Sequence, residues 1–112
     1  MIYHITEKAQ WLLAKVEGKL EHESLESEGF IHCCTEALFP QVVDFHFKGW
    51  PSIYVLEIDE EKITSELKWE KVGGHSFPHI YGPIDVDSVV RGTEIFPNDE
   101  GIFEFPFSQL LH

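Results

Sequence analysis

The chain has 112 residues and a formal net charge of −12, because 20 Asp and Glu side chains outnumber 8 Lys and Arg. A surface this acidic repels polyanions, and one arginine, Arg91, with scattered lysines cannot form the basic patch that nucleic acids require, so we expect no nucleic-acid partner. Hydrophobic residues make up 43% of the sequence, enough to form the core of one domain over residues 1–112 without disulfides or a structural metal.

Nothing in the sequence marks the protein for export or for a membrane. The first residues show none of the features of a signal peptide, which are a basic segment, an apolar run and a cleavage site with small residues. No apolar stretch approaches the ~20 residues that a membrane-spanning helix requires. Cys33 and Cys34 are neighbours, and neighbouring cysteines rarely pair because the geometry is strained, so both thiols are expected to be reduced. We expect a cytoplasmic protein without membrane contact, present as a monomer or a weak dimer.

The N-terminal region predicts a strand followed by a helix. Residues 1–5 are β-prone, Thr6 is placed to cap the helix that follows, and Gly18 is placed to end it. Trp11 lies roughly 200° around the helix from Ala9, so another segment or a ligand must cover it. Spacings of three and four positions predict the buried face of the helix, which consists of Ala9, Leu12, Leu13 and Val16.

The middle of the chain predicts an acidic loop, a buried strand and a second helix. Residues 19–28 are polar and charge-rich, with one helical turn near residues 24–27. Residues 30–34 form an aromatic and β-branched run that is typical of a buried strand. Residues 39–48 predict a helix, because Pro40 fits its first turn and apolar residues recur along it.

The second half of the chain predicts strands in succession. Residues 53–58 form the clearest strand, and the alternation of apolar and charged residues over 67–72 predicts a half-exposed one. Residues 73–83 contain three Gly and two Pro and predict a loop. Two further strands are predicted over residues 88–96 and 101–105. Early helices followed by successive strands indicate an α+β fold with a largely antiparallel sheet.

Histidines supply the main candidates for a functional site. The chain has seven, and histidine changes charge near neutral pH and both donates and accepts hydrogen bonds, which suits ligand contact and proton transfer. Four of them stand in short segments flanked by glycine or aromatic residues: His4, His32, His75 and His79. For each of these alone a structural role is the simpler interpretation, and for His22 and His46 it is the one we adopt.

Two other chemistries would use the same segments. A zinc site could combine the histidines of residues 75–79 with the adjacent cysteines, although Pro78 prevents those histidines from sharing a helix face. A nucleophilic cysteine could pair with a histidine, although His32 and Cys33 point to opposite faces of a strand. A pair of inert buried thiols is the simpler interpretation, and we expect no metal.

Two more features lie in the second half of the chain. Glu70 follows Trp69 on the half-exposed strand, where it is either a solvated carboxylate or a group that the next loop folds over a pocket, with a pKa raised by burial. Residues 77–83 combine two prolines, aromatic rings and His79. A rigid turn against the sheet edge and a binding loop are equally good interpretations of this segment.

Several segments carry a resemblance to a known family. They are Tyr3-His4-Ile5, Trp11, Ser24-Leu25, residues 28–33 (Glu-Gly-Phe-Ile-His-Cys), Trp69-Glu70 and residues 77–83 (Phe-Pro-His-Ile-Tyr-Gly-Pro). Their order and spacing, essentially from end to end of the chain, resemble the domain of unknown function 952 family of short bacterial proteins. No reaction is established for that family, so the resemblance implies a fold and candidate residues only.

A more distant similarity concerns the start of the chain. Residues 3–6 (Tyr-His-Ile-Thr), a helix, and then residues 30–33 (Phe-Ile-His-Cys) are similar to the start of ADP-ribosyltransferase-like domains, including RNA 2′-phosphotransferases. The resemblance implies that His4 binds ribose hydroxyls of NAD and that His32 lies beside it in one cleft. In those domains a glycine usually follows the first histidine and its backbone clamps nicotinamide, whereas this chain has Ile5.

The preferred hypothesis combines these points. We expect a compact single α+β domain of the ADP-ribosyltransferase-like kind, with a split, mostly antiparallel sheet and two early helices. Its cleft would bind an NAD- or ADP-ribose-like small molecule and could transfer ADP-ribose; a non-catalytic binding module and a His/Cys metal-binding protein are the alternatives. The candidate catalytic residues are His4, His32 and Glu70, and the candidate ligand-binding residues are Trp11, Thr6, Phe30, His79, Tyr81 and Gly82.

Overall fold

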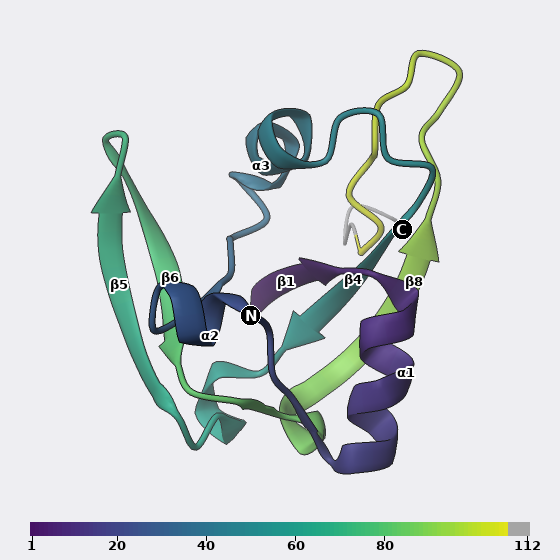
Figure 1. The fold of residues 1–112 in the computed structure, drawn as a ribbon. Helices are drawn as coiled ribbons and strands as arrows, with labels where there is room; N and C mark the ends of the chain where they lie inside the picture. Colours follow the sequence, from purple (N-terminus) through teal and green to yellow (C-terminus); the bar gives the residue numbers. More distant parts are fainter. Residues whose placement is uncertain (108–112) are drawn as a thin grey trace, which may run out of the picture.

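Two three-stranded sheets organise the structure, a computed structural model that describes residues 1–107 (Figure 1). The helices are α1 (Lys8–Glu17), α2 (Ser24–Ser27) and α3 (Phe39–His46), with 3₁₀ turns η1 (Glu60–Lys62) and η2 (Val86–Ser88). The strands are β1 (Ile2–Thr6), β2 (Lys19–Leu20), β3 (Ile31–His32), β4 (Ile53–Ile58), β5 (Glu66–Val72), β6 (His75–Tyr81), β7 (Ile84–Asp85) and β8 (Val89–Ile95). One sheet has the order β1-β4-β8, the other β3-β6-β5, and β2 pairs with β7.

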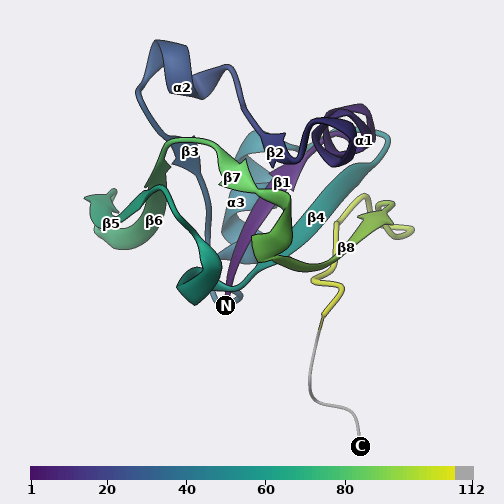
Figure 2. The ribbon, with the colours of Figure 1, turned by 90° about the horizontal axis from the view of Figure 1, so that it is seen from below.

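The pairings confirm the predicted α+β class. Each strand pair formed within residues 1–107 is antiparallel. Figures 1 and 2 show the two three-stranded sheets on opposite sides of the molecule, with α1 beside the β1-β4-β8 sheet. The predicted strands over residues 53–58 and 67–72 and the predicted helical turn over residues 24–27 are confirmed as β4, β5 and α2.

Within residues 1–107, one backbone bridge links the two three-stranded sheets. Tyr3 on β1 donates a hydrogen bond to the carbonyl of Cys34, and Cys34 donates one to the carbonyl of Tyr3, both at 2.8 Å. Beyond this bridge, β1 pairs with β4 and β3 pairs with β6. The two sheets therefore part between β1 and β3.

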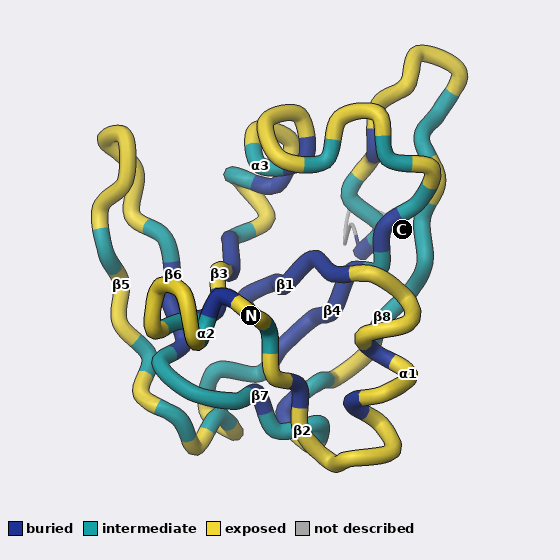
Figure 3. Tube along the Cα trace, viewed as in Figure 1, coloured by how far each residue is buried: buried dark blue, intermediate teal, exposed yellow. Residues whose placement is uncertain are grey.

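Apolar side chains fill two clusters on the two faces of β1, which is buried along its whole length (Figure 3). Successive side chains of a strand point to opposite faces, so Ile2 joins one cluster and Tyr3 the other. The first cluster contains Ile2, Trp11, Ala14, Leu20, Ile31, Cys33, Leu56, Ile58, Ile80 and Ile84. The second contains Tyr3, Ile5, Cys34, Phe39, Val43, Ile53, Val55, Phe103 and Phe107.

Helix α1 buries a different face from the predicted one. Trp11 and Ala14 are 7% and 2% exposed, whereas Leu13 and Val16 are 53% and 84% exposed. The indole of Trp11 packs on the ring of Tyr54 in β4, with ring centroids 6.3 Å apart and an angle of 29° between the planes. An indole buries more apolar area than an aliphatic side chain, so Trp11 rather than the aliphatic stripe sets the orientation of the helix.

The C-terminal end of α1 lies where the sequence predicts it, and the N-terminal end does not. Gly18 ends the helix in the left-handed conformation, with φ of 86°, as predicted. At the start, Thr6 is the last residue of β1 rather than the cap, and Glu7 takes the N-cap position without a side-chain hydrogen bond. Within residues 1–107, none of the helices is long and apolar enough to cross a bilayer.

The predicted loop over residues 73–83 is largely a strand, β6, at the centre of its sheet. Gly73 and Gly74, with φ of 60° and 87°, form the two-residue turn that joins it to β5. Pro78 accepts a hydrogen bond from the N–H of Cys33 but has no N–H to return, so β3 ends one residue earlier. The short partner strand is what allows a proline inside this sheet.

Residues 101–105, predicted as a strand, form an irregular segment instead. The side chain of Asn98 accepts hydrogen bonds from the N–H groups of Glu100 and Ile102, and the N–H of Asn98 donates to the carbonyl of Ile102. These local bonds occupy backbone groups that a strand would use. Phe103 and Phe107 then anchor the segment in the second core cluster.

The assignment of the buried face of α1 can be tested by two alanine substitutions. We expect Trp11→Ala to lower the free energy of unfolding by about 3–5 kcal/mol, because it opens a cavity in the core. Leu13→Ala should change it by less than about 0.5 kcal/mol, because Leu13 is exposed. Urea unfolding of both variants measures the difference, and equal losses would contradict the assignment.

Candidate functional site

His4 sits at the point where the two sheets part. In a continuous antiparallel ladder, the Tyr3–Cys34 pair would be followed by a hydrogen-bonded pair of Ile5 and His32. No backbone hydrogen bond joins Ile5 to His32 in the described structure. Instead, Nδ1 of His4 lies 2.8 Å from the carbonyl oxygen of His32. The imidazole thus replaces the backbone group that would have continued the ladder.

This contact fixes the chemical state of the His4 ring. A carbonyl oxygen only accepts, so Nδ1 carries the proton and Nε2 presents a lone pair. Burial lowers the pKa of His4 to about 4, against the smaller opposing effect of the His32 carbonyl, so the ring is neutral at neutral pH. His4 is 3% exposed, and its Nε2 is buried without a hydrogen-bond partner among the described residues. It is an acceptor that lacks a donor.

His22 lies next to this acceptor. Its ring meets the ring of His4 edge-on, with centroids 5.9 Å apart. The N–H of Ser24 donates to Nδ1 of His22 at 3.0 Å, so a neutral His22 carries its proton on Nε2. Both hydrogen-bond contacts of the His22 ring within the described residues go to Ser24, the first residue of α2.

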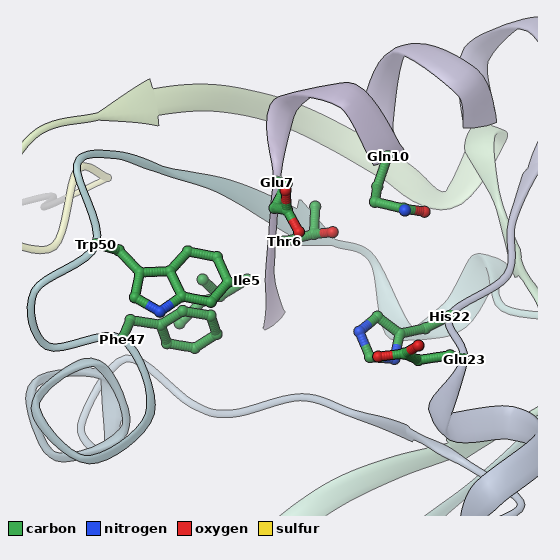
Figure 4. Close-up of a pocket in the computed structure, with 8 residues that line it drawn as sticks. All are labelled: Ile5, Thr6, Glu7, Gln10, His22, Glu23, Phe47 and Trp50. Carbon is green, nitrogen blue, oxygen red and sulfur yellow. The ribbon is translucent and has the colours of Figure 1, made fainter.

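A cavity of about 230 Å³ opens beside His22, at the end of β1 (Figure 4). Figure 4 shows Trp50 and Phe47 on one side of this cavity and His22 and Glu23 on the other. The rings of Trp50 and Phe47 pack edge to face with centroids 4.9 Å apart. The residues that line the cavity are Ile5, Thr6, Glu7, Gln10, His22, Glu23, Phe47 and Trp50.

The backbone of Ile5, a residue that lines the cavity, has polar groups without a backbone partner among the described residues. Backbone groups of an antiparallel strand point alternately to its two neighbours. Because the N–H and C=O of Tyr3 point to Cys34, those of Ile5 point to the same side, away from β4. The described residues offer these two groups no backbone partner. Ile5 therefore presents one donor and one acceptor, side by side, where the sheets part.

A second group of predicted residues gathers on the β3-β6-β5 sheet. Nδ1 of His79 lies 2.7 Å from the Glu70 carboxylate, and the Tyr81 hydroxyl donates to the same oxygen. The bond from Tyr81, and then that from His79, lowers the pKa of Glu70, which is therefore ionised at neutral pH. The bond to Glu70 raises the pKa of Tyr81 in turn.

Phe30 joins this group to the loop before β3. Its ring stacks on the ring of His79, with centroids 4.1 Å apart and 21° between the planes. His32 is opposite His79 in the register and its ring meets that of His79 edge-on at 5.4 Å. Nε2 of His32 lies 3.0 Å from the carboxylate of Glu28, and this bond lowers the pKa of Glu28.

The structure thus divides the predicted site residues among four places. Thr6 lines the cavity, and His4 lies against it through His22. Trp11, which we expected to stack on a ligand, is part of the core instead. Gly82 passes Ser65 so closely that a Cβ atom would lie 2.5 Å from its hydroxyl oxygen, which is a packing requirement. The aromatic and acidic group on the second sheet consists of Phe30, His32, Glu70, His79 and Tyr81.

Most cavity residues could not be identified from the sequence. They come from β1, α1, the loop before α2 and the segment after α3, and only the fold brings these together. The sequence favours a structural role for His22, because His22 is not among the four histidines in segments flanked by glycine or aromatic residues. One local signal existed at Trp50, which stands between Gly49 and Pro51 and so presents an aromatic ring on a rigid turn.

The cysteines have the properties expected of inert thiols. Cys33 and Cys34 are buried and not bonded to each other. Burial raises the pKa of Cys33 well above its ordinary value and that of Cys34 to about 12, so neither is a thiolate at neutral pH. Among the described residues, no group of three or more His, Cys, Asp and Glu is arranged to hold a metal ion.

The low pKa of His4 predicts how stability depends on pH. Between pH 6.5 and about 4 the unfolded chain takes up a proton at His4 that the folded chain does not, so the free energy of unfolding falls as pH decreases. Titration of His4 changes the free energy of unfolding by at most about 1.4 kcal/mol per pH unit. Urea unfolding across this range should show the slope in the wild type and its loss in His4→Asn. An NMR titration midpoint of His4 near 6.5 would contradict the prediction.

The bond from Tyr81 predicts a pKa change at Glu70. Tyr81→Phe removes the donor with the largest effect, so the pKa of Glu70 should rise toward its ordinary value. Carbon-13 NMR titration of the Glu70 carboxylate measures this. Tyr54→Phe serves as the matched control, because Tyr54 lies on the other sheet against Trp11. An unchanged Glu70 titration in Tyr81→Phe would show that the bond does not form in solution.

Comparisons with known proteins agree with the family resemblance. The crystal structure of protein CC0527 from Caulobacter crescentus is similar, with a TM-score of 0.83 and 30% sequence identity over 92% of both chains. The solution NMR structure of CC0527 gives a TM-score of 0.77 over 90% of this chain and 89% of that one. No functionally curated protein matches. The family model described as "Protein of unknown function (DUF952)" matches residues 5–92, and the chain therefore belongs to the DUF952 family.

Proposed function

We propose that the opening between β1 and β3 binds a small ribosyl ligand of the NAD or ADP-ribose type. The observation that carries the proposal is Nε2 of His4, a buried acceptor to which no group in residues 1–107 donates. An unpaired buried polar atom costs ~1–3 kcal/mol, and a ligand hydroxyl would supply the missing hydrogen bond. Ribose carries such hydroxyls, and the similarity of residues 3–6 and 30–33 to ADP-ribosyltransferase-like domains implies the same role for His4.

Movement of one side chain would connect His4 to the cavity. His22 lines the cavity and contacts the His4 ring. Because the hydrogen-bond contacts of its ring go to Ser24, the first residue of α2, rotation of the His22 side chain would leave both sheets intact. A hydroxyl of a ligand in the cavity would then reach Nε2 of His4.

The other polar groups of the cavity suit the nicotinamide end of such a ligand. A carboxamide has one donor and one acceptor side by side, which complement the C=O and N–H of Ile5. The indole of Trp50, packed against Phe47, offers a flat aromatic wall to a ring. A cavity of about 230 Å³ is smaller than the roughly 300–1,000 Å³ of sites for drug-sized ligands, so it would hold one end of a dinucleotide.

Transfer of ADP-ribose would need more than binding. An ionised carboxylate must stabilise the positive charge that develops at the anomeric carbon. Glu70, the residue expected to do this, is held by His79 and Tyr81 and is not among the residues that line the cavity. We therefore propose a binding function and assign no transfer step to Glu70.

His4→Asn is the variant that tests this proposal. Asparagine can place an N–H donor near the position of Nδ1, so the bond to the carbonyl of His32 can be kept while the Nε2 acceptor is lost. We expect NAD or ADP-ribose to bind the wild type, with amide chemical-shift changes at residues 5–10, 22–23 and 47–50. The affinity of His4→Asn should be about tenfold weaker, as for the loss of one hydrogen bond.

His75→Asn is the matched control, because His75 is exposed at the far end of the β5–β6 hairpin. It should bind like the wild type. Free nicotinamide, measured in the same samples with NAD, distinguishes binding from turnover. An absence of shift changes with both ligands at millimolar concentration would refute the proposed function.

A further inference from the structure

We infer that the cavity selects a planar aromatic cation over a neutral or anionic ring. This inference rests on the proposed function, because it concerns the same cavity, and it adds the charge of the lining residues to the argument. The described residues that line the cavity include two carboxylates, Glu7 and Glu23, and neither Lys nor Arg. The chemistry of this lining attracts positive charge.

The charge balance around the cavity is negative. The N-terminus of α1, where Glu7 takes the N-cap position, contributes the equivalent of about +0.5 charge. When both carboxylates are ionised, their combined charge is opposite in sign to that of the helix terminus and about four times as large. The whole chain adds a net charge of −12, which raises the local concentration of cations.

Basic side chains that could reverse this balance are directed elsewhere. The ammonium of Lys8, the residue after Glu7, lies 3.7 Å from the carboxylate of Glu94 on β8. The guanidinium of Arg91, the only arginine of the chain, pairs with Glu57 at 2.8 Å. A phosphate or carboxylate in the cavity would therefore meet acidic side chains without a compensating cation from the lining residues.

The aromatic wall favours the same class of ligand. Cations are attracted to the faces of aromatic rings, and tryptophan is the strongest of these partners. Trp50 is half-buried, and Phe47 packs edge to face against it, which holds the indole in place. In Figure 4 both rings lie on the side of the cavity opposite to Glu23. A flat cation between them would meet a ring on one side and a carboxylate on the other.

Size restricts the ligand to a single substituted ring. The volume of about 230 Å³ does not accommodate a dinucleotide, and a diphosphate would be repelled by the acidic lining. An N-substituted pyridinium combines one ring, one positive charge and space for a carboxamide that Ile5 can bind. In an NAD-type ligand, this part would enter the cavity and the phosphates would remain outside.

Three probes of nearly the same shape test the inference. They are 1-methylnicotinamide, which is cationic, benzamide, which is neutral, and nicotinate, which is anionic. We expect 1-methylnicotinamide to bind at least about tenfold more tightly than benzamide, and nicotinate to bind most weakly. Added salt should reduce the preference for the cation, because screening weakens attraction to exposed carboxylates such as Glu7 and Glu23. Equal affinities for the cation and benzamide would overturn the inference.

Isosteric variants identify the groups responsible. Glu7→Gln combined with Glu23→Gln should reduce the preference for the cation over benzamide to less than about threefold, because the cation then binds more weakly. Glu17→Gln, at the exposed C-terminal end of α1, is the control and should keep the full preference. A preference that survives in the double variant would show that the carboxylates are not its source.

The probes also distinguish this inference from the proposed function. Binding of NAD or ADP-ribose without a preference among the three probes would leave the proposed function standing and refute the cation selectivity. A clear preference for 1-methylnicotinamide without binding of NAD or ADP-ribose would support the selectivity and refute the ribosyl ligand.

Discussion

The hydrogen bond from Nδ1 of His4 to the carbonyl of His32 is the contact on which the rest of the structure depends. It occupies the position of a backbone bond between β1 and β3 and so keeps the strands apart directly after the Tyr3–Cys34 bridge. Because a carbonyl can only accept, the same bond fixes the proton on Nδ1 and leaves Nε2 as a buried acceptor. One contact therefore determines both the shape of the opening and the chemistry of the atom next to it.

The segment between β2 and β3 connects the cavity to the second sheet. Its first part supplies His22 and Glu23 to the cavity lining, and its last part places Phe30 on His79. Leu20, buried in the core, and the stacked Phe30 hold the two ends of this segment. The aromatic and acidic group on the β3-β6-β5 sheet thus has a clear structural role, since it anchors the loop that forms one wall of the cavity.

The sequence predicted those elements whose local signals agree with one another. The strand over residues 53–58 and the helix end at Gly18 are examples. The prediction of a loop over residues 73–83 was wrong because a distant partner strand decides the secondary structure there. Pro78 is accommodated inside a sheet only because its partner β3 is short. The same limit applies to the site. His4 could be identified from its flanking residues, whereas His22 and Trp50 became candidates only when the fold placed them beside one cavity.

Tyr3 packs edge-on against Phe105, with ring centroids 4.9 Å apart, and shares a core cluster with Phe103 and Phe107. One face of the first strand is therefore covered by side chains about a hundred positions later in the chain. Contacts between such distant residues form slowly because a long loop must close first. During translation, β1 is therefore synthesised well before its aromatic cover. The second core cluster can form completely only after residue 107 has been added, so complete burial of this face of β1 must wait for the synthesis of that residue.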